Sequence, residues 1–133
     1  MPLHWTISSE KRLFEVACSG FVEADEVHRM LDILVSSKAL GYRKLFDASD
    51  ADTRMTAFEI LNIGVRMRSL HAGGRALGAL AVVIPGEKFQ LLSRVLGILA
   101  TPRRPMRIFN KTDQARRWLE KAAVRASART LDR

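Results

Sequence analysis

The stretch that decides the fold is RKLFDASDADTRMTAFE, residues 43–59, because it joins a hydrophobic strand to a capped helix through an acidic connection. RKLFDA, residues 43–48, has the apolar centre of a short strand. Thr56 and Glu59 form a T-x-x-E capping box in front of an apolar run. In such a box the threonine hydroxyl accepts from the glutamate N–H, and the glutamate carboxylate accepts from the threonine N–H. The stretch therefore predicts a strand followed by a helix that begins at Thr56.

The segments on both sides of this stretch alternate between strand and helix patterns. We predict strands at LHWTI (3–7), RLFEVAC (12–18), LGALAVVIP (77–85) and MRIF (106–109). We predict helices within residues 21–37, 56–74, 86–100 and 112–124. Strands that alternate with helices pair in parallel through crossover connections. The predicted fold class is therefore α/β, with a single, mostly parallel five-stranded sheet, four helices and the first strand as an edge addition.

The helix at 21–37 has the clearest periodicity. Its apolar residues recur at helical spacing, and its first turn is acidic, which suits the positive end of the helix dipole. The apolar positions are Val27, Met30, Leu31, Leu34 and Val35.

Length and composition indicate one domain, which we place at residues 1–123. Residues 124–133 lack core side chains and are predicted to form a disordered tail. No segment approaches the roughly 20 apolar residues of a membrane span, and no leader precedes the first strand, so we expect a cytoplasmic protein. Cys18 is the single cysteine and is expected to be a small buried side chain.

The charge is unevenly distributed along the chain. Residues 1–60 contain 7 Lys+Arg and 10 Asp+Glu, or −3, and residues 61–133 contain 15 and 4, or +11. This uneven charge favours an anionic partner, such as a phosphorylated ligand, an anionic membrane surface or nucleic acid. A basic surface that is only solvated, with no partner, would explain the same distribution of charge. Nucleic acid ranks lowest, because Trp118 lies in an apolar helix stripe and no aromatic platform is present.

The acidic connection does not match an EF-hand. A loop that starts at Asp47 places Asp52 where glycine is needed and Phe58 where the closing glutamate is needed. A start at Asp50 places Leu61 at that last position. We therefore predict no metal site. No catalytic motif occurs, and the three histidines lie on separate predicted elements, so neither enzymatic activity nor a cofactor is expected.

Several segments together resemble the SpoIIAA-like family, which is related to STAS and Sec14-type domains. They are RKLFDAS, the threonine-capped helix, ALAVVIP and the ending RIFNKTDQARRWL. The resemblance implies strand and helix pairs wound as a right-handed superhelix. It also implies that Phe109 closes the last strand while Ala115, Trp118 and Leu119 pack the last helix onto the sheet.

The same resemblance suggests candidate recognition residues. Anti-sigma-factor antagonists of the STAS group carry an Asp-Ser pair at the start of the second helix, and a partner kinase phosphorylates the serine. The matching positions here are Met55 and Thr56, so the hydroxyl is kept and the aspartate is missing. The resulting candidates for a recognition loop and phospho-acceptor are Asp47, Ser49, Thr53 and Thr56.

Two predicted helices, at 56–74 and 86–100, carry more apolar surface than one core needs. In the helix at 56–74, one stripe contains Phe58, Leu61 and Val65, and a second contains Ile60, Ile63 and Met67. Burial on two sides, a homodimer interface or a groove for a lipid-like ligand would each explain this surplus. A basic rim for an anionic head group would come from Arg66, Arg68, Arg103 and Arg104.

Two functional hypotheses follow. The first is a non-enzymatic regulatory or scaffold module that contacts a protein partner, or itself as a homodimer, through the Asp47–Thr56 loop. The second is a carrier or sensor of an amphipathic or anionic small molecule, in the manner of Sec14. An apolar cavity between the second and third predicted helices, at 56–74 and 86–100, favours the second hypothesis, whereas a packed interior with a flat exposed patch favours the first.

Overall fold

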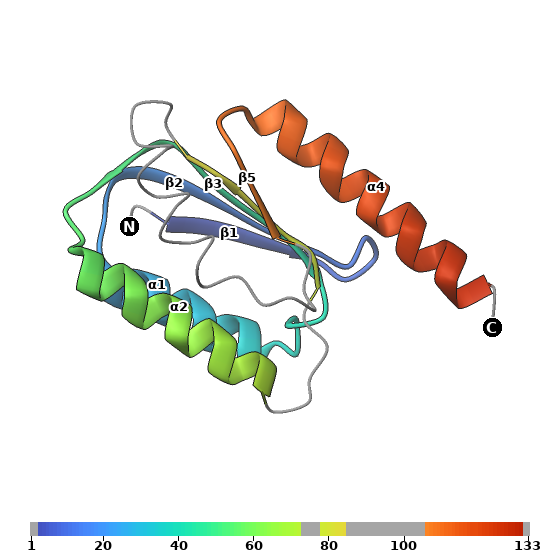
Figure 1. The fold of residues 1–133 in the computed structure, drawn as a ribbon, viewed down its shortest axis with the longest axis horizontal. Helices are drawn as coiled ribbons and strands as arrows, with labels where there is room; N and C mark the ends of the chain where they lie inside the picture. The colour runs from blue at the N-terminus through green and yellow to red at the C-terminus, as the bar shows by residue number, and fades with distance from the viewer. Residues whose placement is uncertain (1–2, 73–77, 85–105, 132–133) are drawn as a thin grey trace.

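The structure is a computed structural model that describes residues 3–72, 78–84 and 106–131 (Figure 1). This part of the chain contains five strands and three helices. The strands are β1 (Leu3–Ser8), β2 (Leu13–Val22), β3 (Arg43–Thr53), β4 (Leu80–Val83) and β5 (Met106–Phe109). The helices are α1 (Ala24–Ser36), α2 (Ala57–Ala72) and α4 (Thr112–Leu131). The helix predicted within residues 86–100 lies outside the described residues.

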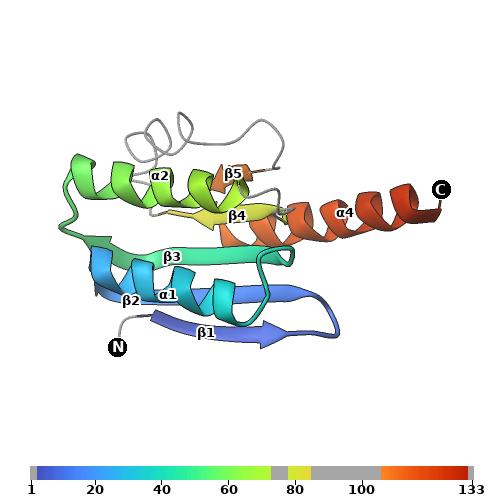
Figure 2. The same cartoon turned by 90° about the horizontal axis from the view of Figure 1, so that it is seen from below.

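The strands form a single mixed sheet in the order β1-β2-β3-β4-β5 (Figure 2). β1 pairs antiparallel with β2 at one edge, as the sequence predicts, and the three remaining pairs are parallel. The predicted α/β class and the five strands are therefore confirmed in a sheet of mixed direction.

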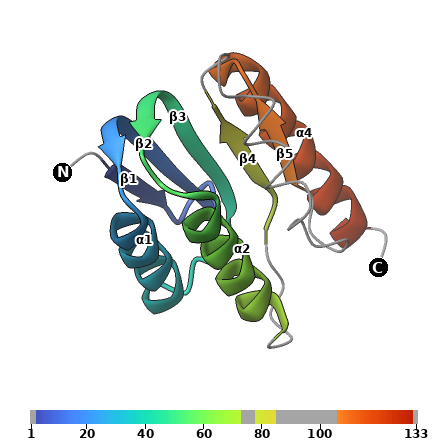
Figure 3. The ribbon, with the colours of Figure 1, turned by 60° about the vertical axis from the view of Figure 1, so that its left-hand side comes forward.

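The sheet is covered on both faces (Figure 3). α1 and α2 lie on one face and α4 lies on the other. The short strand β4 shows why both faces need a cover, because its residues are buried on either side. Ala81 and Val83 pack in the cluster that contains α4 residues, and Leu80 and Val82 pack in a separate cluster. The apolar run ALAVVI is thus a strand buried on both faces, as predicted.

α1 confirms its predicted stripe, since Val27, Met30, Leu31 and Leu34 are all buried. The helix ends in a Schellman motif. The Ala39 N–H donates to the Leu34 carbonyl at 3.0 Å, and the Lys38 N–H donates to the Val35 carbonyl at 3.1 Å. Lys38 occupies the left-handed position of this motif, with φ of 59°. Glycine is the usual residue there, so the motif carries backbone strain.

β3 is longer than the sequence predicts. We expected a strand at residues 43–48 and a recognition loop within Asp47 to Thr56, whereas β3 continues to Thr53. The extension pairs with the end of β2, where Ser19 to Val22 lie beside Asp50 to Thr53 after a register shift. The predicted recognition loop is therefore mostly strand, and only residues 54–56 connect β3 to α2.

α4 is also longer than predicted. It continues to Leu131, so the predicted boundary between domain and tail at residue 123 falls inside a helix. Alanine, leucine and arginine, which occur in this extension, are strong helix formers. Near its start, Ala115 and Leu119 are buried, and the Trp118 ring lies 5.9 Å from the Phe109 ring between centroids. The packing implied for RIFNKTDQARRWL is therefore confirmed.

Candidate functional site

An apolar cavity of about 170 Å³ lies on the face of the sheet that α1 and α2 cover. β2, β3, β4 and β5 contribute its floor, and the two helices contribute its walls. Representative lining residues are Phe14, Leu31, Phe46, Ile63, Val82 and Met106.

Two sequence patterns make this lining apolar. Along β2, Phe14 and Val16 are two positions apart and therefore point to the same face of the sheet. Along α2, Ile60 and Ile63 are buried and belong to the inward stripe that the periodicity predicts. Each of these elements turns its apolar side chains toward the same space, so the cavity that remains between them has an apolar lining.

Lys44 is a charged residue in this lining. Its side chain is 5% exposed, and it shares a face of β3 with Phe46 two positions later. The ammonium group donates hydrogen bonds to the carbonyl of Leu40 at 2.6 Å and to the carbonyl of Tyr42 at 2.8 Å. These carbonyls belong to the turn after α1, so the turn fixes the position of the Lys44 charge.

Asp52 also lines the cavity, eight positions after Lys44 on the same strand. Because a strand rises about 3.3 Å per residue, the two residues stand roughly 26 Å apart along β3. Asp52 is exposed, in contrast to buried Lys44. The lining is therefore almost entirely apolar, and Lys44 and Asp52 lie toward opposite ends of it.

The outward stripe of α2 forms a second feature. Phe58 is 71% exposed, Leu61 40% and Val65 55%. We call these three residues the outer face of α2. Phe21 at the end of β2 is also exposed, at 49%, and the Arg54 guanidinium carbon lies 4.2 Å from the centre of its ring. The predicted surplus of apolar surface on this helix is therefore present as exposed side chains.

Three of the four predicted recognition residues have described side chains, and each of these takes part in a hydrogen bond. Asp47 accepts hydrogen bonds from the Ser49 hydroxyl at 2.6 Å and from the Thr112 hydroxyl at 3.0 Å, which ties β3 to the start of α4. Thr56 caps α2 and is exposed. The side chain of Thr53 lies outside the described part of the structure.

The predicted capping box is confirmed. The Glu59 N–H donates to the Thr56 hydroxyl oxygen at 3.2 Å, and the Thr56 N–H donates to the Glu59 carboxylate at 3.1 Å. Both bonds satisfy donors at the start of α2 that have no partner within the helix. The exposed Thr56 hydroxyl therefore has a structural role.

Arg66 also has contacts within the protein. Its guanidinium donates to the His28 carbonyl at 2.8 Å and forms an ion pair with Asp32, so it connects α2 to α1. The other candidates for the predicted anion site, Arg103, Arg104 and the side chain of Arg68, lie outside the described residues, so that site stays a prediction.

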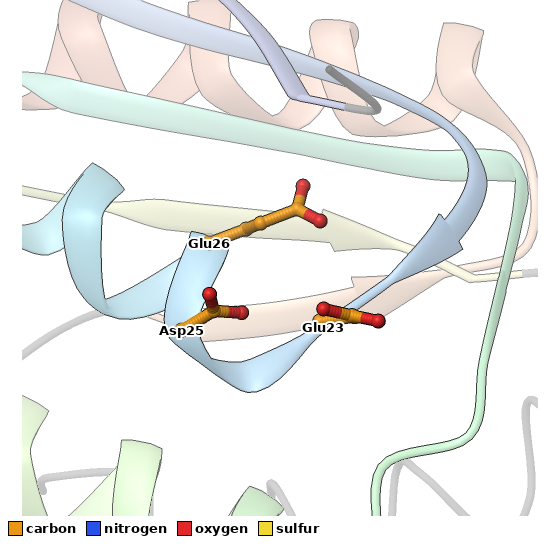
Figure 4. A group of neighbouring side chains, drawn as sticks. All are labelled: Glu23, Asp25 and Glu26. Carbon is orange, nitrogen blue, oxygen red and sulfur yellow. The ribbon is translucent and has the colours of Figure 1, made fainter.

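An acidic cluster lies at the start of α1 (Figure 4). Ligand oxygens of Glu23, Asp25 and Glu26 lie within 4.8 Å of one another, and the group could hold a metal ion. Asp25 pairs with Arg29 at 3.6 Å. A metal ion is not needed to explain this cluster, because the helix dipole stabilises carboxylates at a helix N-terminus.

Cys18 is buried near this cluster, as predicted. Burial, and then the negative charges of Asp47 and Glu26, raise the pKa of its thiol to about 12. The thiol therefore stays protonated at neutral pH and is a poor nucleophile.

Among solved structures, the chain is similar to a crystal structure of an uncharacterized protein of the DUF3478 family from Shewanella loihica PV-4, described as having a SpoIIAA-like fold. The TM-score is 0.57 at 19% sequence identity, and the match covers 88% of this chain and 91% of the other. The fold is SpoIIAA-like. No protein-family model matches the sequence, and no curated protein matches it significantly.

The SpoIIAA-like sheet places the cavity and the outer face of α2 on opposite sides of one helix. Ile63 lines the cavity and Leu61, two positions earlier, is exposed.

None of the helices in the described ranges is both long and apolar enough to span a membrane. The sequence predicted both apolar stripes of α2 but did not predict that Lys44 lines the cavity. Lys44 stands two residues before Phe46 in a predicted strand, so its place on the same face could have been inferred.

Proposed function

We propose that this SpoIIAA-like domain is a non-enzymatic carrier or sensor that binds a small apolar or amphipathic molecule between the sheet and helices α1 and α2. The observation that supports the proposal is the apolar cavity of about 170 Å³. For comparison, an engineered apolar cavity of about 150 Å³ in another protein stays dry and binds benzene. A space of this size and lining favours small apolar groups over water.

The proposal is tested with hexan-1-ol as a probe. A ligand that binds only the folded state raises the unfolding temperature as its concentration increases. We expect hexan-1-ol to raise the unfolding temperature of the full chain at millimolar concentrations. A native mass spectrum of freshly purified protein tests the same proposal, since a retained ligand would add mass to the 14.9 kDa chain.

A cavity-filling variant separates binding in the cavity from binding elsewhere. Ala48 lines the cavity, so Ala48→Leu should fill part of it and abolish the effect of hexan-1-ol. Ala17→Leu is the matched control, because Ala17 is exposed and lies outside the lining. An equal response of both variants and the wild type would place the alcohol outside the cavity and refute the proposal.

The outer face of α2 favours a second candidate function, contact with a second copy of the chain. Phe58, Leu61 and Val65 recur along one side of the helix and are all exposed. Two such stripes related by a two-fold axis would pair Phe58 of one protomer with Val65 of its partner, which makes the contact self-complementary. A homodimeric regulatory or scaffold module would use this face, and the test is argued in the Discussion.

A further inference from the structure

We infer that the outer edge of β1 pairs with β1 of a second copy of the chain, so that two five-stranded sheets join into one continuous sheet. This contact is separate from the cavity and from the outer face of α2, and it goes beyond the proposed function.

β1 is an edge strand whose outer side is open among the described residues. It pairs with β2 along its whole length, Leu3–Ser8, and no second described strand lies beside it (Figure 2). In an antiparallel pair, alternate residues direct their N–H and C=O groups to the partner strand, and the residues between them direct theirs away from it. The outer edge of β1 therefore presents main-chain donors and acceptors that another strand would satisfy.

The composition of β1 permits such pairing. Edge strands that are protected from other strands usually carry charged residues, proline or a bulge. β1 contains no aspartate, glutamate, lysine, arginine or proline, and its register with β2 has no shift. A second copy of β1 therefore meets no like charge and no residue that lacks an N–H.

Symmetry restricts how two copies of β1 align. Two edges that meet antiparallel are related by a two-fold axis perpendicular to the sheet, which keeps each face of the sheet on the same side in both copies. Side chains alternate between the faces, and Leu3 and Trp5 pack in the cluster that contains α1 residues. Odd-numbered residues must therefore pair with odd-numbered ones, and the alignments with long overlap are centred on Trp5 or on Thr6.

Exposure favours the alignment centred on Thr6. It places Ile7, which is 41% exposed, beside the half-buried Trp5 of the second copy, and pairs of aromatic and β-branched residues stabilise sheets. It also places the exposed Thr6 beside its own copy, and threonine pairs contribute in the same way. The alignment centred on Trp5 would instead place Ile7 beside Leu3, which is already buried within its own chain.

The contact is small, so we expect it to be weak. About five residues on each side would pair, against roughly 20 to 30 residues a side in a stable interface. Self-pairing of β1 is therefore expected at concentrations of about 0.1 to 1 mM, above those at which larger interfaces form.

Oxidative cross-linking of Thr6→Cys tests the alignment. Opposed Cα atoms of antiparallel strands lie about 4.5 to 5.5 Å apart, which is within the range of a disulfide. With diamide as the oxidant and protein at about 0.5 mM, most of the variant should run as a covalent dimer on a non-reducing gel. Cys18 is buried and should not contribute, and wild-type protein treated in the same way checks this point.

His4→Cys is the matched control, because His4 is exposed on the same face of the same strand. In the expected alignment, the two copies of residue 4 lie four positions out of register, or roughly 13 Å along the strand, which is too far for a disulfide. Equal cross-linking of the two variants, or cross-linking of neither, would overturn the inference.

Charge substitutions at Thr6 provide a second measurement. Thr6→Lys opposes two ammonium groups at the two-fold axis and should weaken the association that appears between micromolar and millimolar concentration by at least about tenfold. An equimolar mixture of Thr6→Lys and Thr6→Glu should restore it, since opposite charges then face each other. Gln114→Lys, at an exposed position of α4, should leave it unchanged. Sedimentation equilibrium measures the mean mass, and a mixture that associates no better than Thr6→Lys alone would contradict the pairing of β1.

Discussion

At the start of α2, Thr56 and Glu59 exchange two hydrogen bonds of 3.2 Å and 3.1 Å. Thr56→Ala removes the side-chain acceptor and should lower the free energy of unfolding by about 0.5 to 2 kcal/mol. Thr56→Ser keeps the hydroxyl and should cost much less. Urea denaturation of the three proteins measures the difference, and an alanine variant within a few tenths of a kcal/mol of wild type would show that the box contributes nothing.

Lys38 offers the opposite result, a stabilising substitution. Its φ of 59° at the end of α1 costs a residue with a Cβ roughly 1 to 2 kcal/mol, and glycine avoids that cost. Lys38→Gly should therefore raise the free energy of unfolding by about 0.5 to 1 kcal/mol, after the greater backbone entropy of glycine is subtracted.

The control for this prediction is Ser36→Gly, in the last turn of the same helix. Glycine at a helical position lowers stability by about 0.5 to 1 kcal/mol, so the two variants should shift the urea midpoint in opposite directions. A decrease in stability for both variants would mean that the Lys38 side chain makes a contribution larger than its backbone strain.

Among the elements, those with clear periodicity were predictable. The stripe of α1 and the strand MRIF follow directly from the spacing of apolar residues and from length. The second half of β3 was not predictable, because Asp50 and Asp52 have low strand propensity and resemble a turn. Pairing with Ser19 to Val22 of β2 outweighs that propensity, and a single sequence does not reveal such pairing.

The outer face of α2 leads to a prediction about assembly. Phe58 is 71% exposed and Val65 55%, so association that covers them would remove apolar surface from water. We expect the chain to form a homodimer at micromolar concentration, and Leu61→Asp at the centre of this face should convert it to a monomer. Sedimentation velocity measures both states.

Asn110→Asp is the matched control, since Asn110 is exposed, lies in the turn between β5 and α4 rather than on α2, and receives the same negative charge. It should leave the dimer intact. A wild-type monomer of 14.9 kDa would contradict the prediction and leave the exposed stripe without a role in self-association.

At the scale of the whole molecule, the cavity could not be predicted from the sequence. A void depends on how side chains from β2, α1, β3 and α2 fit together, and the same apolar pattern would also suit a filled core. The inward stripe of α2 and the apolar face of β2 were predictable one element at a time. The hydrogen bonds from Lys44 to the carbonyls of Leu40 and Tyr42 were not predictable either, because they depend on how the turn after α1 folds beside β3.

The strand order has a consequence for how the chain folds during synthesis. Each strand of the sheet pairs with its neighbour in sequence, so β1, β2, α1 and β3 can associate as soon as they emerge, without waiting for distant segments. The opposite face differs, because Leu45, Ala81 and Val83 pack against α4, which follows all five strands in sequence. These side chains must remain exposed until α4 has been synthesised, and a nascent chain that lacks α4 is therefore expected to be prone to aggregate.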